Sequence, residues 1–103
     1  MIALHCGLGE YNLSFSKNRE LRKILKNVSF EMIKSIKEGN DSVDVVCKCV
    51  AMLEDIKYTN AGIGSALTEN ASVEMEAGVM EGLSGLFGGV SCIKHIQNPI
   101  YLA

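Results

Sequence analysis

The sequence predicts a small mixed α/β domain, and three observations predict it. Apolar residues between positions 18 and 38 recur with the period of a helix, and a shorter stripe of the same kind follows between 42 and 54. From 73 to 79 apolar and polar residues alternate instead, which is the period of a strand with one buried face. With 103 residues, the chain is expected to form one domain at most, in which two helices pack on a sheet.

The first predicted element is a short strand at residues 2–4, which runs into the glycine loop Cys6-Gly7-Leu8-Gly9. Two glycines so close together allow positive φ and the close approach of another backbone. They do not match a phosphate-binding loop, because the lysine and the three-glycine spacing of such loops are absent.

Two helices are predicted next, over residues 18–38 and from about 42 to Glu54. The stripe of the first comprises Leu21, Ile24, Leu25, Val28, Met32, Ile33 and Ile36. The apolar face of the second comprises Val46, Cys49, Val50 and Leu53. Gly39-Asn40 should end the first helix, because glycine adopts the left-handed conformation easily. Asp41 or Ser42 can then cap the second.

The alternating segment 73–79 is predicted to pair with residues 63–67, with a turn at Glu69-Asn70. Residues 88–93 predict a further short strand. Asn98-Pro99 is a typical helix start. Four residues follow it, too few to sustain an α-helix, so we expect the chain to be the truncated part, 1–103, of a larger domain.

Composition excludes some classes of function. The net charge of −2 argues against a nucleic-acid-binding protein, because phosphate contacts need a cationic surface. No run approaches the roughly 20 apolar residues that span a bilayer, so we expect no membrane segment. The four cysteines do not have the spacing of a disulfide framework. These features favour an intracellular protein, cytoplasmic or nuclear.

Pairs of cysteine and histidine give only weak metal motifs. Cys47 and Cys49 are two residues apart on a predicted helix, so their thiols point to different sides and core packing is the better interpretation. Cys92 and His95 have a usable spacing, but nothing places them beside a second pair such as His5-Cys6. A loop-closing hydrogen bond is the simpler role for His5.

Acidic residues of the alternating segment could form a carboxylate pair for acid–base catalysis. Glu74 and Glu76, however, share the polar face of the predicted strand, and Glu81 follows it. Exposure to solvent is therefore the expected role.

The segment Thr59-Asn60-Ala61-Gly62-Ile63-Gly64 is the strongest candidate for a site. Its glycines permit an unusual backbone around one asparagine, whose amide can donate and accept hydrogen bonds at once. Such a group can hold a nucleophile or stabilise an oxyanion.

These segments resemble the asparaginase-2 family of N-terminal-nucleophile hydrolases. Residues 53–65 are similar to its LED…NAG-x-G-S segment, and residues 74–82 to its EMDA-x-x-MDG strand. Residues 5–9 resemble its opening HGGAG loop, while residues 88–90 and 96–100 fall where the family has G-A-V and I-K-N-P. The resemblance covers nearly the whole chain.

The resemblance implies the N-terminal half of an α-β-β-α sandwich that cleaves itself into α and β subunits. A threonine at the new N-terminus of the β subunit would be the nucleophile, with its own amine as base. His5, Gly7 and Gly9 would form the loop behind that threonine. Asn60, with Gly62 and Gly64, would lie beside it.

The resemblance also implies a structural sodium ion, with no other cofactor. Its ligands would be backbone carbonyls of six residues: Leu53, Glu54, Ile56, Thr59, Ala61 and Ile63.

Within the family, Thr59 before Asn60 and a non-glycine after His5 are more similar to threonine aspartases (taspases), which cleave peptides after aspartate. One alternative is a fragment of an L-asparaginase or isoaspartyl peptidase. Another is a non-enzymatic remnant that binds an intact subunit.

The sequence departs from the family pattern at Glu76 and Glu81, where the family has aspartate, and at Cys6 and Leu8 in the glycine loop. No threonine follows a family-like Gly or Asp at a scission point, so the nucleophile is expected on a missing β-subunit half or a homologous subunit. Alone, the chain should be inactive and either oligomeric or molten, because a sheet face would remain uncovered.

Overall fold

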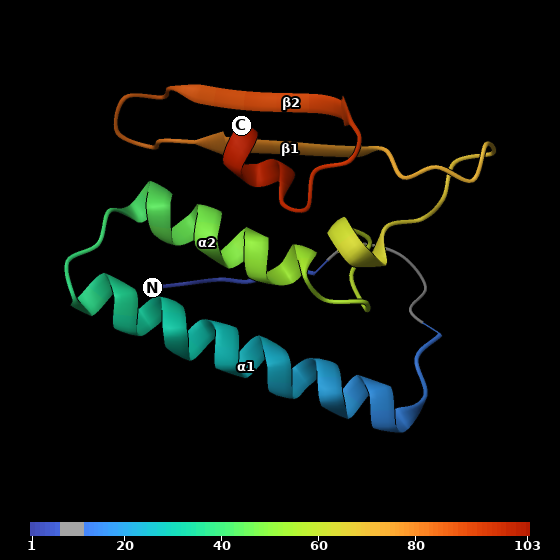
Figure 1. Cartoon of the computed structure of the whole chain (residues 1–103). Helices are drawn as coiled ribbons and strands as arrows, with labels where there is room; N and C mark the ends of the chain where they lie inside the picture. Colours follow the sequence, from blue (N-terminus) through green and yellow to red (C-terminus); the bar gives the residue numbers. More distant parts are fainter. Residues whose placement is uncertain (7–11) are drawn as a thin grey trace.

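The computed structural model describes residues 1–6 and 12–103 and confirms the mixed α/β class. The elements are the α-helices α1 (Phe15–Lys37) and α2 (Ser42–Glu54), the 3-10 helices η1 (Gly62–Gly64) and η2 (Pro99–Leu102), and the strands β1 (Met75–Met80) and β2 (Phe87–Ile93). Figure 1 shows them in sequence colours.

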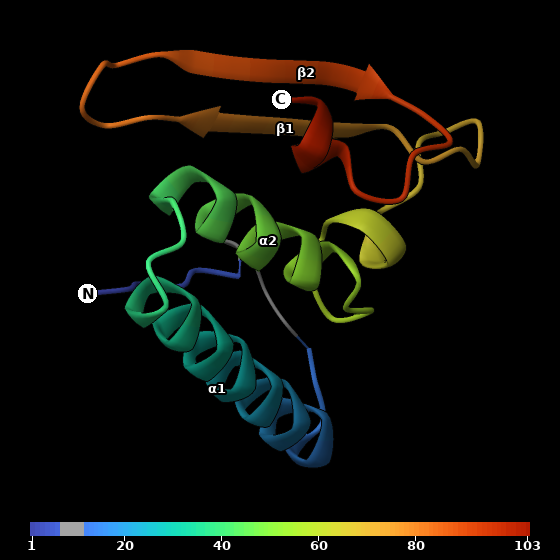
Figure 2. The ribbon, with the colours of Figure 1, turned by 60° about the vertical axis from the view of Figure 1, so that its left-hand side comes forward.

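The elements form layers in the order α1, α2, β hairpin. Helix α1 contacts α2, and α2 contacts β1 on its other side. The 3-10 helix η2 returns to lie between the hairpin and α2, touching both, as the two views show (Figures 1 and 2). The C-terminal segment therefore connects the helical layer to the sheet.

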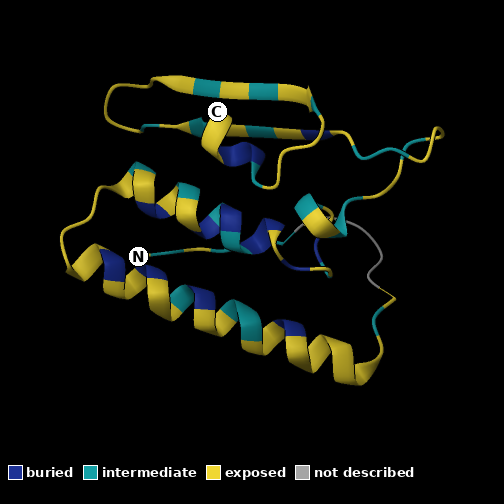
Figure 3. Ribbon diagram, in the orientation of Figure 1, coloured by how far each residue is buried: buried dark blue, intermediate teal, exposed yellow. Residues whose placement is uncertain are grey.

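The principal apolar core lies between the two α-helices (Figure 3). Val28 and Met32 of α1 meet Val45 and Cys49 of α2, and Met32 is fully buried. The predicted stripe of α1 is confirmed from Leu21 to Met32 but is wrong at Ile33 and Ile36, which are exposed while Ser35 is buried. The predicted face of α2 is wrong at one position. Val46 is half exposed and Val45 takes its place, because Val45, Cys49 and Leu53 form the row of side chains, four residues apart, that faces inward.

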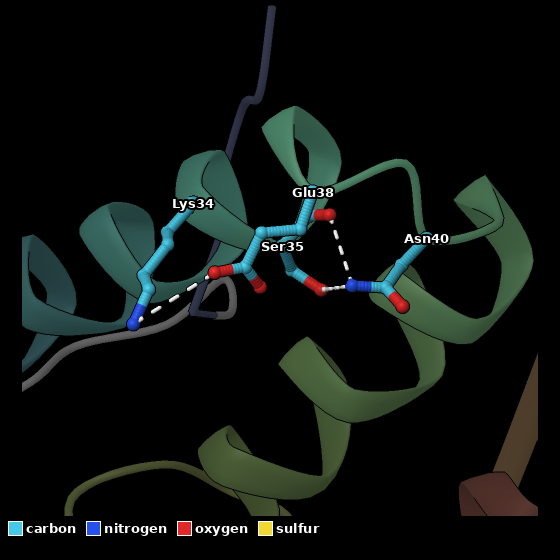
Figure 4. Close-up of polar contacts among 4 residues, drawn as sticks. All are labelled: Lys34, Ser35, Glu38 and Asn40. Atoms are coloured by element: carbon cyan, nitrogen blue, oxygen red, sulfur yellow. Dashed lines mark hydrogen bonds and ion pairs between the residues drawn. The ribbon is translucent and has the colours of Figure 1, made fainter.

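The structure confirms the residues predicted to end α1 and to begin α2. The Val43 N–H donates to Asp41 Oδ1 at 2.8 Å, which makes Asp41 the cap of α2. Gly39 has a φ of +85° just beyond α1. Asn40 then donates through Nδ2 to the carbonyl and the hydroxyl of Ser35, both at 3.0 Å, next to the Lys34–Glu38 ion pair (Figure 4).

The strand predicted at residues 2–4 is not present. Ile2 and Leu4 pack instead against the core between the helices. A strand needs hydrogen bonds to a neighbour, and the sheet that the described residues form contains β1 and β2 alone. Ile2 and Leu4 are thus partly buried without forming a strand.

The partner predicted for β1 is wrong. β1 pairs antiparallel with β2, with Ala77 opposite Val90 and Met80 opposite Phe87, so the hairpin spans 75–93. Residues 63–67 do not form a strand, because the segment begins in the 3-10 helix η1 and the Ala66 N–H donates to Asn60 Oδ1 instead of to a neighbouring strand. The predicted strand at 88–93 and the turn at 69–70 are confirmed.

Pro99 opens a helix as predicted, but in the 3-10 form. At the opposite end of the hairpin, apolar side chains are exposed: Met80, Leu83, Leu86 and Phe87. No helix in the described part of the chain is long and apolar enough to cross a membrane.

Candidate functional site

The loop between α2 and β1 carries the candidate site, and Thr59 fixes it from inside. Thr59 is buried, and its hydroxyl lies 2.6 Å from the carbonyl oxygen of Leu53 and 2.9 Å from that of Ile56. It can donate to one of these at a time. The hydroxyl thus ties the loop to the last turn of α2.

Asn60 follows directly and points outward. Its side chain is exposed, and its Oδ1 accepts the Ala66 N–H at 2.9 Å. Because the side-chain oxygen is used by the backbone, the Nδ2 amide is the group that can donate to a ligand. The loop is therefore held by two kinds of hydrogen bond, one from the buried Thr59 hydroxyl and one to the exposed Asn60 side chain.

Two glycines are required for this backbone. A Cβ on Gly62 would lie 2.1 Å from the carbonyl oxygen of Glu54, and one on Gly64 would lie 2.0 Å from that of Thr59. Both distances are far below van der Waals contact, so any other residue would force the loop apart. Gly62 and Gly64 therefore shape the loop rather than contribute chemistry.

A cavity of about 430 Å³ opens beside Asn60. Its polar lining includes Asn60, Ser65, Glu54, Glu74 and Glu76, and Gly62 also borders it. Of the residues predicted to support the site, the structure brings Asn60 and Gly62 to this cavity.

His5 lies elsewhere among the described residues. It lines a second, apolar cavity of about 330 Å³ between the N-terminal segment and the helices, together with Met32 and Val45. The structure therefore does not bring His5 to the same cavity as Asn60. Gly7 and Gly9, the other predicted members of the opening loop, lie outside the described residues.

Glu54 is the residue that sequence reasoning undervalued. Only 3% of it is exposed, although it is charged and ends a helix. Its carboxylate accepts Asn98 Nδ2 at 3.1 Å and the backbone N–H of Ile100. Burial raises the pKa of Glu54 above its ordinary value, while these hydrogen bonds act in the opposite direction. No local sequence pattern signals this burial, because the contact joins Glu54 to Asn98, 44 positions further along the chain.

The six backbone carbonyls predicted to bind a sodium ion are oxygen donors, the ligand type that such a cation prefers. Those of Leu53 and Ile56 both lie near the Thr59 hydroxyl, while those of Glu54 and Thr59 approach Gly62 and Gly64. Neutral oxygen donors from one short loop suit a hard cation. Ala61 and Ile63 would complete the predicted set, which stays a prediction.

The other acidic residues have structural partners. Glu74 forms an ion pair with Lys94 at 2.8 Å. Glu81 accepts the N–H groups of Leu83 and Ser84 and the Ser84 hydroxyl, which lowers its pKa and closes the hairpin turn. Glu76 is exposed and, like Glu74, borders the Asn60 cavity. These roles agree with the solvated or structural interpretation.

The cysteines show no metal centre in the described residues. No group of three or more His, Cys, Asp or Glu side chains there could hold a metal ion. Cys49 belongs to the core, whereas Cys47 is only partly buried.

Comparison with known proteins identifies the family. A family model described as asparaginase (asparaginase-2) matches residues 1–103. The chain belongs to the asparaginase-2 family. It is 37% identical over 103 residues to the isoaspartyl peptidase/L-asparaginase of Bos taurus, covering 100% of this chain and 33% of the relative. Two further asparaginase-2 relatives agree with this match.

The probable isoaspartyl peptidase/L-asparaginase 2 of Arabidopsis thaliana is 38% identical, covering 99% of this chain and 32% of the relative. The isoaspartyl peptidase of Escherichia coli K12 is 34% identical, covering 100% of this chain and 33% of the relative. The chain thus spans about a third of the length of the curated relatives it matches. Asparaginase-2 proteins are N-terminal-nucleophile hydrolases, and the mixed α/β fold is consistent with the N-terminal part of that architecture.

Proposed function

We propose that this chain forms the N-terminal part of an isoaspartyl peptidase/L-asparaginase-type hydrolase. It supplies the wall of the site, with Asn60 beside the cavity, and the nucleophilic threonine belongs to the remaining part of the enzyme. The observation that carries the proposal is the match over residues 1–103 to proteins with these names, joined to a rigid loop that presents Asn60.

The threonine aspartase interpretation has less support. It depended on two positions, Thr59 and the non-glycine Cys6 after His5, and in the structure the Thr59 hydroxyl serves the loop itself at the carbonyls of Leu53 and Ile56. A residue with that role carries no information about the substrate. The names of the relatives favour the small-substrate alternative.

In the proposed mechanism, Asn60 acts through its Nδ2 amide. Fixed by the Ala66 N–H, the side chain offers a donor to the attacking oxygen or to the oxyanion of the tetrahedral intermediate. A bound sodium ion would hold the loop at the carbonyls described above without entering the reaction.

A hybrid protein tests the proposal. In it, residues 1–103 replace the matching third of the bovine relative, which supplies the rest of the enzyme. We expect the hybrid to release aspartate from L-asparagine and from a β-aspartyl dipeptide. Asn60→Ala should lower kcat by about 10²-fold, and Asn70→Ala, an exposed turn residue, should not.

Two outcomes would overturn the proposal. Cleavage of peptides after aspartate without turnover of either small substrate would restore the threonine aspartase interpretation. A folded, self-processed hybrid that hydrolyses neither class of substrate would favour a non-enzymatic remnant that binds an intact subunit.

A further inference from the structure

Glu54 occupies an unusual position for a carboxylate. It ends α2 with 3% of its surface exposed, and its side chain faces two donors, Asn98 Nδ2 at 3.1 Å and the Ile100 N–H. An ionised carboxylate can accept both of these bonds, because it has two acceptor oxygens and no hydrogen.

Asn98 extends the contact over the end of the helix. Its Nδ2 also lies 3.2 Å from the carbonyl oxygen of Ala51 and 3.2 Å from Asp55 Oδ1. Gln97 Nε2 reaches the same Asp55 oxygen at 3.1 Å. The segment before η2 is thus held against the C-terminus of α2, where Figure 2 shows it between the helix and the hairpin.

η2 is buried at its start as well as hydrogen-bonded. Pro99 and Ile100 are almost completely buried, Ile100 to 2% exposure. Pro99 also borders the cavity that Glu54 and Asn60 line. Movement of this segment would therefore change the cavity directly.

The backbone and Cβ of Glu54 support the Asn60 loop on the other side. Gly62 lies so close that a Cβ there would be 2.1 Å from the Glu54 oxygen and 2.8 Å from the Glu54 Cβ. The turn that begins at Gly62 leads to Ala66, whose N–H holds Asn60. A displacement of Glu54 must reach Asn60, because close-packed groups transmit strain.

We propose that Glu54 is a positioning residue of the site, whose buried side chain holds the Asn98–Ile100 segment while its backbone fixes the turn that orients Asn60. The proposal rests on the proposed function, since it assigns Glu54 a role in the same site. The Glu54 carboxylate is bonded to Asn98 rather than directed at Asn60. It acts on catalysis through Asn60.

Glu54→Gln is the direct test in the hybrid. Glutamine removes the negative charge and replaces one carboxylate oxygen by an NH₂ donor, which weakens the contact with Asn98 Nδ2. We expect kcat for L-asparagine to fall about 10- to 100-fold, because a small displacement of an oriented group is enough for such a loss. KM should change less than 3-fold. Glu31→Gln, at an exposed site on α1, is the matched control and should change neither constant.

Hydrogen exchange gives a readout that does not depend on activity. The Ala66 amide, which bonds Asn60, should exchange at least 10-fold faster in Glu54→Gln, while the amides of Val28 and Met32 in the helical core keep their rates. A purely structural role would speed exchange in all of these amides together.

Unchanged kcat and unchanged Ala66 exchange in a folded Glu54→Gln hybrid would overturn the proposal. If that variant does not fold, Asn98→Ala decides the question, since it removes the main side-chain partner of Glu54 from a half-buried site. The same loss of Ala66 protection is expected there, and normal protection would refute the role. An unsubstituted hybrid without activity would refute the proposed function only, because the exchange test still applies.

Discussion

The helical pair and the Asn60 loop are stabilised by different interactions. Between α1 and α2 the stabilising contacts are apolar and replaceable, made by side chains such as Val28, Met32 and Cys49. In the loop they are single hydrogen bonds and close backbone contacts around Thr59 and Gly62. Apolar contacts are expected to tolerate residues of similar volume, whereas the backbone contacts at Gly62 and Gly64 leave no room for a Cβ. This contrast is expected where a scaffold carries a site.

The largest effect should come from the helical core. Met32→Ala removes a fully buried side chain and should lower the free energy of unfolding by about 2–5 kcal/mol. Met80→Ala, where 62% of the side chain is exposed, is the control and should cost far less. Thermal unfolding of the hybrid measures both, and similar losses would contradict the assignment of the core.

Gly62→Ala tests whether the loop requires the backbone conformation of Gly62. The residue has a φ of +55°, and the new Cβ would collide with the Glu54 carbonyl. The strained backbone alone costs about 1–3 kcal/mol. Gly82→Ala meets no atom within 4 Å and should be nearly neutral in the same unfolding experiment. Equal stability of the two variants would show that the turn can relax.

Sequence patterns predicted the two helices well, because a helix with one buried face has apolar residues that recur at the helical period in the sequence. They gave Met32, Cys49 and the Asp41 cap correctly. They failed at 63–67, which were predicted to be the strand partner of 73–79, although this segment begins in η1 and the Ala66 N–H donates to Asn60 Oδ1. The family segment identified Asn60 itself, but the burial of Glu54 depends on Asn98, a contact that no local pattern encodes.

Thr59→Val separates the hydroxyl from the shape of the side chain. Valine keeps the branched form but removes the donor that serves the carbonyls of Leu53 and Ile56. A loss of about 0.5–1.5 kcal/mol is expected, the net value of one hydrogen bond, since both carbonyls keep a backbone N–H partner. Thr59→Ser keeps the hydroxyl and should recover most of this in thermal unfolding. No recovery would mean that packing of the methyl group matters more.

The smallest effect should be at the hairpin turn. Hydrogen bonds from Ser84 and Leu83 lower the pKa of Glu81 below its ordinary value of 4.5. A lowered pKa stabilises the turn above the unfolded-state pKa, and this stabilisation is lost as pH falls through the folded-state pKa. The Ser84 amide signal in NMR should therefore titrate below pH 4.5. Glu81→Gln should abolish that titration, and its persistence would assign it to another group.

The bond between Glu54 and Asn98 joins residues 44 positions apart, and the loop and hairpin lie between them. Closing so long a segment lowers the conformational entropy of the chain before the stabilising contacts form. The contacts within each helix are local and need no such closure. During folding, the helices are therefore expected to form first. The Asn60 loop should reach its final shape only when the C-terminal segment has returned to α2, so the part of the chain that carries the site should be ordered last.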